Sequence, residues 1–174
     1  DFLVSFVRTD IAEELNMAVP VSWDEVIDTL PQLQRQYLDY YLPNSKGALS
    51  SLLYAMVAQK GGRLYDEEGT KTLLTEPKAM EAFIDFTTFF SDYGFEISAN
   101  FSNRFRSGEM PMGVANFSLY NTLSVFAPEI RGHWEFRPLP GYDFDGEIRN
   151  ETTSTVSGTV ILGDTKEAKA SWVY

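Results

Sequence analysis

Residues 101–141, FSNRFRSGEMPMGVANFSLYNTLSVFAPEIRGHWEFRPLPG, predict helix and strand in close succession. Phe101 and Phe105 are at helical spacing, so they share one face of a short amphipathic helix, and Gly108 is placed to end that helix. Residues 111–115 are then expected to form a brief strand. The segment therefore places a turn between a strand and a second helix, and that turn is a candidate ligand site.

The second helix is expected to begin at Asn116. Apolar residues recur behind this position at helical spacing, namely Leu119, Leu123 and Phe126. Asn at a helix start can cap the free backbone N–H groups, and the same groups can bind a hydroxyl or an anion of a ligand. Asn116 and Phe117 are therefore predicted to contact a ligand.

The composition is that of an ordinary globular domain. The chain has 174 residues, 44% of them hydrophobic and 22% charged, which is enough to bury a normal core. Its 14 Lys and Arg against 25 Asp and Glu leave a net charge of −11. This charge argues against nucleic acids and anionic membranes as partners, because both would repel it. Aromatic residues make up 14% of the chain, and their flat rings suit sugar faces, although for any one ring the core is the simpler interpretation.

The sequence contains no cysteine, so it has neither disulfides nor thiol chemistry. No apolar run approaches the roughly 20 residues that cross a bilayer, and no basic segment precedes an apolar one. The chain enters an apolar run directly at Asp1 and stops inside a helix-like run at Tyr174. We therefore expect it to be a fragment of a longer protein whose signal sequence lies upstream.

The remaining segments alternate between extended and helical patterns. Residues 2–7 are expected to form a strand, and Ser22 and Glu25 form a capping box for a helix that Pro31 should kink or split. Further expectations are a helix over 48–60, a hairpin over 63–74, a helix from Thr75 to Tyr93, a strand over 158–162 and a helix opened by 164–167.

The sequence points to no particular enzyme class. His133 is the only histidine, so no metal cluster can rest on histidines, and a Ser-His-Asp arrangement has one possible centre. Phosphate-binding and nucleophile-elbow motifs do not occur. Residues 142–147 carry a faint calcium-loop pattern, but the later ligands are missing and a structural turn is the preferred interpretation.

Two separated parts of the chain resemble the extracellular solute-binding proteins that deliver sugars to ABC importers. Residues 8–34, RTDIAEELNMAVPVSWDEVIDTLPQLQ, match a charged turn, a short helix, a proline-bearing link and a Trp-containing cap of that family. The second match is an ordered series formed by Phe105-Arg106-Ser107-Gly108-Glu109, Met112-Gly113-Val114, Asn116 to Tyr120, and Leu139-Pro140-Gly141.

The resemblance implies an α/β fold, a periplasmic-binding-protein-like class II lobe with a mixed sheet flanked by helices. Residues 1–174 would be a single lobe, the C-terminal type, of a two-lobed protein. Residues 1–7 and 155–162 would cross the hinge, and 163–174 would begin the return into the missing first lobe. The resemblance implies no cofactor and no metal.

The resemblance also implies where a sugar would bind. Ser50 and Ser51 open the helix that lines the cleft in relatives, Tyr120 matches an aromatic position, and Asn44 lies across the cleft. From the residues alone, Ser50 and Ser51 could instead simply start a helix. Tyr120 could instead belong to the core. Maltose-binding protein carries an acid-Pro-aromatic triplet where this chain has Leu-Ser-Ser at 49–51, and a Trp where it has Ser118. These departures from the family's pattern argue against maltodextrin as the ligand.

The function implied is that of the substrate-binding component of an ABC importer. Its partners would be a sugar or oligosaccharide, the membrane permease and the missing lobe, with no nucleic acid. Its place would be extracellular or periplasmic, as a membrane-anchored lipoprotein in the full-length form. Two alternatives stay open: a ligand-sensing or adhesion module on the same fold, and a non-catalytic part of a polysaccharide-degrading enzyme.

Overall fold

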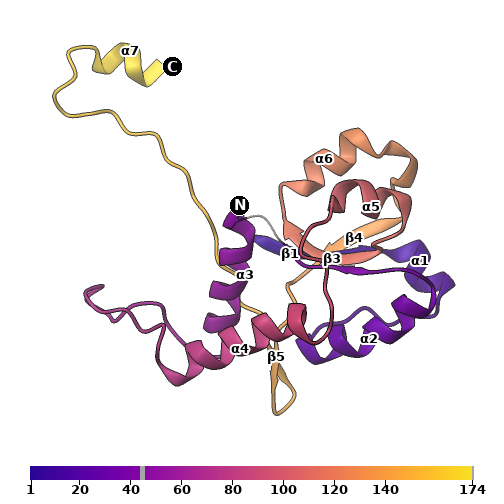
Figure 1. Ribbon diagram of the computed structural model, residues 1–174. Helices are drawn as coiled ribbons and strands as arrows, with labels where there is room; N and C mark the ends of the chain where they lie inside the picture. Colours follow the sequence, from indigo (N-terminus) through magenta and orange to yellow (C-terminus); the bar gives the residue numbers. More distant parts are fainter. Residues whose placement is uncertain (44–45, 174) are drawn as a thin grey trace.

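A four-stranded mixed sheet in the order β2-β3-β1-β4 organises the chain (Figure 1). The computed structural model describes residues 1–43 and 46–173, and of Lys46, Ala48 and Leu49 the backbone alone. β1 runs antiparallel to β3 and to β4, whereas β2 runs parallel to β3. The strands are β1 (Leu3–Arg8), β2 (Tyr40–Tyr41), β3 (Met112–Asn116) and β4 (Trp134–Arg137).

β1 is the core strand of this sheet. All six of its residues are buried, because β3 and β4 flank it and helices cover both of its faces. Successive side chains of a strand point to opposite faces. Leu3 and Val7 accordingly belong to one apolar cluster, and Val4 and Phe6 belong to the other.

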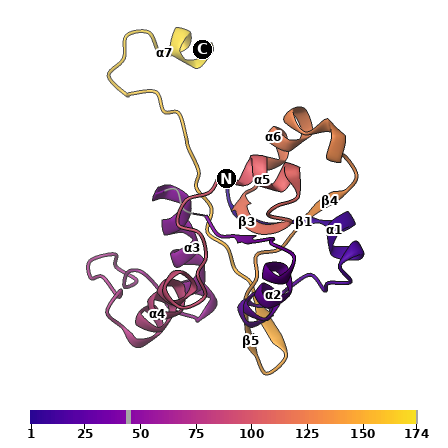
Figure 2. The same ribbon diagram turned by 45° about the vertical axis from the view of Figure 1, so that its right-hand side comes forward.

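The helices form one layer on each side of the sheet (Figures 1 and 2). The apolar cluster on one side takes its helical residues from α1 (Thr9–Glu14), α2 (Trp23–Arg35), α3 (Lys46–Gln59) and α4 (Pro77–Ser91). The cluster on the other side takes them from α5 (Phe101–Ser107) and α6 (Leu119–Phe126). The expected α/β architecture, a mixed sheet flanked by helices, is confirmed.

The start of α2 forms as its sequence predicts. The Ser22 hydroxyl accepts a hydrogen bond from the Glu25 N–H at 3.2 Å, and the Glu25 carboxylate accepts one from the Val21 N–H at 2.7 Å. The expected split at Pro31 is wrong, because α2 is one helix from Trp23 to Arg35. Pro31 removes a single N–H on the exposed side of α2, while the opposite side packs into the core.

The helix after β3 begins three residues later than expected. Asn116 does not begin the helix; it is the last residue of β3 and pairs with Leu3 of β1. The Phe117 N–H continues this pairing by donating to the Phe2 carbonyl at 2.8 Å. α6 therefore begins at Leu119, with Ser118 as its N-cap residue. The ladder with β1 extends β3 beyond the point where the sequence pattern changes to helical.

Smaller elements lie around this body. The expected hairpin over 63–74 reduces to one bridge between Tyr65 and Thr72, with the Asp66 carboxylate closing the loop by accepting from the N–H groups of Thr70 and Lys71. Residues 142–147 form a hairpin turn, as preferred from the sequence. The remaining elements are η1 (Pro128–Ile130), β5 (Tyr142–Phe144), β6 (Glu147–Arg149) and α7 (Ala168–Val173).

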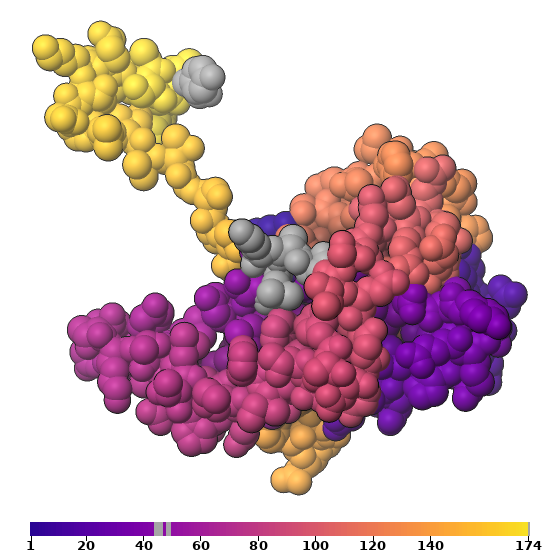
Figure 3. All heavy atoms as spheres, viewed as in Figure 1, coloured from indigo at the N-terminus to yellow at the C-terminus, as the bar shows by residue number. Residues whose placement is uncertain are grey.

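The last segment leaves the body of the domain beside β1. Asp1 and Thr155 exchange two backbone hydrogen bonds, of 2.6 and 2.7 Å, next to a bridge between Phe2 and Ser154. Beyond them the chain extends away to α7 (Figures 1 and 3). The expected strand over 158–162 does not form, because no described segment pairs with it, and Val160 is 79% exposed.

Candidate functional site

Two backbone donors at the turn between β3 and α6 are occupied by the chain itself. The Ser118 N–H donates to Oδ1 of Asp1 at 3.1 Å, and the Ser118 hydroxyl donates to Oδ2 at 2.6 Å. The Phe117 N–H is bound to the Phe2 carbonyl. The expectation that the N–H groups of this turn are open to a ligand is therefore wrong for Phe117 and Ser118.

A hollow of about 610 Å³ borders this turn, and we call it the α5–α6 groove. Most of its lining residues are polar or aromatic and come from β2, the loop before α5, the end of β3 and the start of α6. They are Tyr41, Pro43, Ser98, Ala99, Asn100, Phe101, Ser102, Ala115, Asn116, Ser118, Leu119 and Thr122. The volume falls within the range typical of small-molecule sites.

One wall of the groove is built by two stacked rings. The rings of Tyr41 and Phe101 are nearly parallel, with their centroids 4.3 Å apart. Gly113 makes this contact possible, because a Cβ at Gly113 would lie 2.5 Å from the Cβ of Tyr41 and 3.0 Å from the Phe101 ring. The sequence therefore needs glycine where β2 and α5 approach β3.

Asn116 presents a polar side chain to the groove. It is half-buried at the end of β3, and no hydrogen bond to its amide is recorded in the described part of the chain. A primary amide can donate and accept at once, which matches the hydroxyl groups of a sugar. Asn100, on the facing side, accepts a hydrogen bond from the Asn103 N–H at 3.2 Å and so caps α5.

α5 is held in place by two arginines, of which Arg8 is buried and Arg104 is half-buried. Arg8 donates to the carbonyls of Phe105 and Arg106 at 2.9 and 3.1 Å, so it caps the C-terminal end of α5. Its partner is Asp10, at 2.6 Å. Burial raises the pKa of Asp10, but the hydrogen bond and charge of Arg8 outweigh burial, so the pKa of Asp10 lies below its usual value of 3.8.

A second arginine, Arg104, anchors α5 to the segments beside it. Arg104 binds the carboxylates of Asp39, Glu96 and Glu109. Burial lowers the pKa of Arg104, but its hydrogen bonds to Glu96 and Asp39 outweigh burial and raise it. The guanidinium therefore stays charged and fixes α5 against the loops that flank it.

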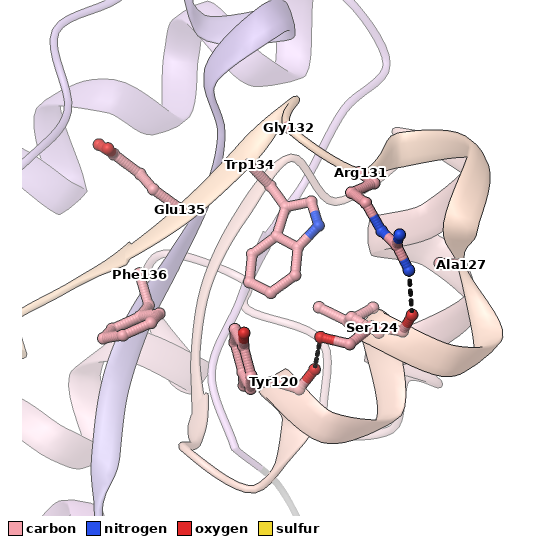
Figure 4. Close-up of a pocket in the computed structure, with 9 residues that line it drawn as sticks. Tyr120, Ser124, Ala127, Arg131, Gly132, Trp134, Glu135 and Phe136 are labelled. Atoms are coloured by element: carbon pink, nitrogen blue, oxygen red, sulfur yellow. Dashed lines mark hydrogen bonds between the residues drawn. The ribbon is translucent and has the colours of Figure 1, made fainter.

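Tyr120 lies on another side of α6 and lines a different hollow (Figure 4). This hollow, which we call the α6–β4 pocket, measures about 450 Å³. Its lining residues are Tyr120, Leu123, Ser124, Ala127, Arg131, Gly132, Trp134, Glu135 and Phe136. The groove and the pocket have no lining residue in common, so the structure separates Asn116 from Tyr120.

Phe117 lies between the two hollows and is tied to its neighbours. Its ring stacks on Phe2 at 5.1 Å and on Tyr120 at 5.9 Å between centroids, and it meets Phe136 edge to face at 5.1 Å. Phe117 is half-buried and lines neither the groove nor the pocket. In this structure it supports the turn rather than facing either hollow.

The predicted serines lie on α3, outside both hollows. The Ser51 hydroxyl donates to the Gly47 carbonyl at 3.0 Å, and the Ser51 carbonyl accepts from the Thr153 hydroxyl at 3.3 Å. Ser50 is exposed. The N-terminal half of α3 thus lies beside residues 152–155, the segment that pairs with Asp1 and Phe2. Asn44 lies outside the described residues.

Sequence reasoning missed three residues of the α6–β4 pocket, namely Arg131, Trp134 and Phe136. Two of them carried a usable signal, since Trp134 and Phe136 are two positions apart and share one face in an extended segment such as β4. Arg131 carried none, because its approach to α6 depends on the turn around Gly132.

Neither a metal site nor a membrane span is found in the part of the chain that the structure describes. The described residues contain no cluster of His, Cys, Asp or Glu side chains that could hold a metal ion. Within the same residues, no helix is both long and apolar enough to cross a bilayer.

Solved structures share this fold. An ABC transporter solute-binding protein from Thermotoga lettingae, bound with alpha-D-tagatose, matches 99% of this chain with a TM-score of 0.75 at 16% identity, over 46% of its own length. The sugar-binding protein MalE from Xanthomonas citri matches 99% of the chain with a TM-score of 0.74 at 17% identity, over 45% of its length. Maltose-bound MalE3 from T. maritima matches 80% of the chain with a TM-score of 0.64 at 18% identity, over 38% of its length.

These matches define the class of fold. The chain has the fold of a lobe of the maltose-binding-protein-like solute-binding proteins, which confirms at the level of fold the resemblance seen in the sequence. It spans less than half the length of the structures that it matches. No protein-family model and no curated protein matches the sequence.

Proposed function

We propose that this chain is one lobe of the substrate-binding component of an ABC importer and that it reversibly binds a carbohydrate. The observation that carries the proposal is the α5–α6 groove on a fold shared with sugar-binding proteins. The Asn116 amide, with no recorded hydrogen bond among the described residues, lies in that groove beside the ring wall of Tyr41 and Phe101.

The chemistry of the groove suits a neutral polyol. Amide and hydroxyl side chains around the rim (Ser98, Asn100, Ser102, Asn116, Ser118 and Thr122) can exchange hydrogen bonds with sugar hydroxyls in both directions. No Lys, Arg, Asp or Glu lines the groove among the described residues. A net charge of −11 further disfavours an anionic ligand approaching from solution.

In this proposal residues 1–174 form a single lobe, and a second lobe closes over the groove. Residues 1–7 and 155–162 would cross the hinge, and 163–174 would begin the return into the other lobe. The backbone pairing of Asp1 with Thr155 supports this arrangement, because it holds both crossing segments side by side next to Ser118 of the groove. Hinge closure would then clasp the sugar and present the closed form to the permease.

The proposed setting follows from the proposed role. An importer component works outside the cytoplasm, in the periplasm or at the cell surface, where a lipid anchor would keep the full-length protein near its permease. The proposed partners are thus a sugar or oligosaccharide, the permease and the second lobe. The proposal includes no catalytic step.

A thermal-shift screen of the intact protein against mono- and oligosaccharides tests this function. The panel includes alpha-D-tagatose, maltose and laminaribiose, because matched structures were solved with them. A sugar that binds only the folded state raises the melting temperature, and the stabilisation grows with the logarithm of its concentration over its Kd. If no carbohydrate in the panel raises it, the proposed function is wrong.

A further inference from the structure

The α6–β4 pocket is a second hollow on the same domain, and the proposed carbohydrate function does not use it. It lies between α6 and the edge strand β4, and none of its lining residues borders the α5–α6 groove. Its volume of about 450 Å³ is sufficient for one six-membered ring with a substituent. A ligand here would therefore be independent of one in the groove.

The pocket has an aromatic floor. Trp134 and Phe136 share one face of β4, and Tyr120 of α6 meets both rings edge to face, at 5.9 and 6.1 Å between centroids. Trp134 is anchored from below by Phe6 and Phe105, at 5.8 and 6.2 Å. The floor is therefore rigid, and a flat ligand face can be buried on it.

Two side chains of the pocket, Arg131 and Trp134, have N–H donors with spare capacity. The Arg131 guanidinium carries five N–H groups, of which one donates to the Ser124 carbonyl at 3.3 Å, and no carboxylate pairs with it among the described residues. Nε1 of Trp134 has no recorded hydrogen bond in the same residues. Figure 4 shows the indole nitrogen on the edge of the ring that faces Arg131 and Ser124.

The nearby carboxylates are already paired. Glu135 binds Arg137 at 2.5 Å, and Glu129 binds Arg106. The positive charge of Arg131 is thus uncompensated locally, although the chain as a whole is acidic. A cationic ligand would be repelled from this rim, whereas a carboxylate would gain a charge-assisted and bidentate partner.

We propose that the α6–β4 pocket binds a small carboxylic acid whose flat apolar ring face lies on Trp134 and whose carboxylate is bound by Arg131. Tyr120 closes the side of the ring, and the Trp134 N–H donates to an oxygen of the ligand. Two kinds of compound share this chemistry. One is a hexuronate, whose ring has an apolar C–H face, and the other is an aromatic carboxylate such as benzoate.

Isothermal titration of the protein with galacturonate, benzoate, galactose and benzyl alcohol tests the proposal. We expect at least one of the two acids to bind and its neutral counterpart to bind much more weakly. Arg131→Gln should weaken binding of the acid by about tenfold or more, because it removes a charge-assisted pair. Trp134→Phe keeps an aromatic floor but removes the N–H donor, and should weaken binding of the acid by a few-fold.

Two controls make the result specific. Arg35→Gln removes the same charge from an exposed position at the end of α2, and should leave acid binding unchanged. Asn116→Ala alters the groove and should also leave it unchanged, which separates this proposal from the carbohydrate function. The proposal is overturned if neither acid binds at millimolar concentration, if the neutral compounds bind equally well, or if Arg131→Gln and Arg35→Gln have the same effect.

Discussion

Oδ2 of Asp1 lies 2.6 Å from the hydroxyl oxygen of Ser118, and Oδ1 of the same carboxylate accepts from the Ser118 N–H at 3.1 Å. A negative charge at the first turn of α6 is favourable, because the unpaired N–H groups there carry partial positive charge. The same Asp1 pairs through its backbone with Thr155. One residue thus connects the start of α6 with the two segments that we propose to cross the hinge.

This relationship predicts coupling between Asp1 and Ser118. Asp1→Ala should lower the free energy of unfolding by about 0.5–1 kcal/mol, as for loss of a partly exposed cap. Ser118→Ala should cost a similar amount. The double variant should cost clearly less than the sum of the two, as measured by urea unfolding in a double-mutant cycle. Additive costs would show that the two side chains do not interact in solution.

Asn116 is expected to act on sugar binding rather than on stability. Asn116→Ala removes an amide that has no recorded partner among the described residues, so the melting temperature should stay nearly unchanged. The affinity for the carbohydrate found in the thermal-shift screen should fall about 2- to 10-fold, as for loss of one neutral hydrogen bond. Asn150→Ala, at an exposed position outside the groove, is the matched control. If Asn116→Ala instead lost as much free energy of unfolding as of sugar binding, Asn116 would be assigned to the core.

Tyr120 should behave in the opposite way. Its ring contacts those of Phe117, Trp134 and Phe136. Tyr120→Ala should therefore lower the free energy of unfolding by about 1–3 kcal/mol, while carbohydrate affinity in the groove is unchanged. Tyr120→Phe keeps the ring and should retain stability, as measured by denaturant unfolding. A stable Tyr120→Ala variant with weakened sugar binding would return Tyr120 to the carbohydrate site.

The sheet and its helices were accessible from the sequence because their side-chain patterns are local. β1 is mostly apolar, with the sequence LVSFVR, and α5 shows its core face through Phe101 and Phe105. The expected strand over 158–162 shows the limit of such patterns. Its apolar residues would look the same with or without a neighbouring strand, and only the fold reveals that the described residues provide none.

The sites were less accessible because they depend on contacts between distant residues. An Asn at the end of a strand and an Asn at the start of a helix look alike in sequence, and only the pairing with Leu3 decides that Asn116 ends β3. Likewise, Tyr120 and Asn116 are near neighbours in sequence, but Asn116 ends β3 and Tyr120 lies on α6, and they line different hollows. The two residues flank one turn but do not share one site.

Gly113 should not tolerate a side chain. A Cβ there would lie 2.5 Å from the Cβ of Tyr41 and 2.8 Å from its carbonyl oxygen, so β2 would have to shift. Gly113→Ala should destabilise the domain by about 1–3 kcal/mol in urea unfolding, as overpacking does. It should also weaken carbohydrate binding, because the Tyr41 ring forms the groove wall. Gly158→Ala, with nothing within 4 Å, should be neutral. Equal stability of the two variants would contradict the close packing of β2 on β3.

The ion pair of Arg8 and Asp10 should make part of the stability depend on pH. The folded pKa of Asp10 is lowered from 3.8, so the folded protein holds the charged form more strongly than the unfolded chain does. The stabilisation is fully present at neutral pH and is lost as the pH falls below 3.8 through the lower folded pKa. Asp10→Asn should therefore be less stable than the parent protein at neutral pH in urea unfolding, and the difference should shrink on acidification. A difference that stays constant down to the acid end of the titration would show that the Asp10 charge contributes nothing to holding Arg8 against the end of α5.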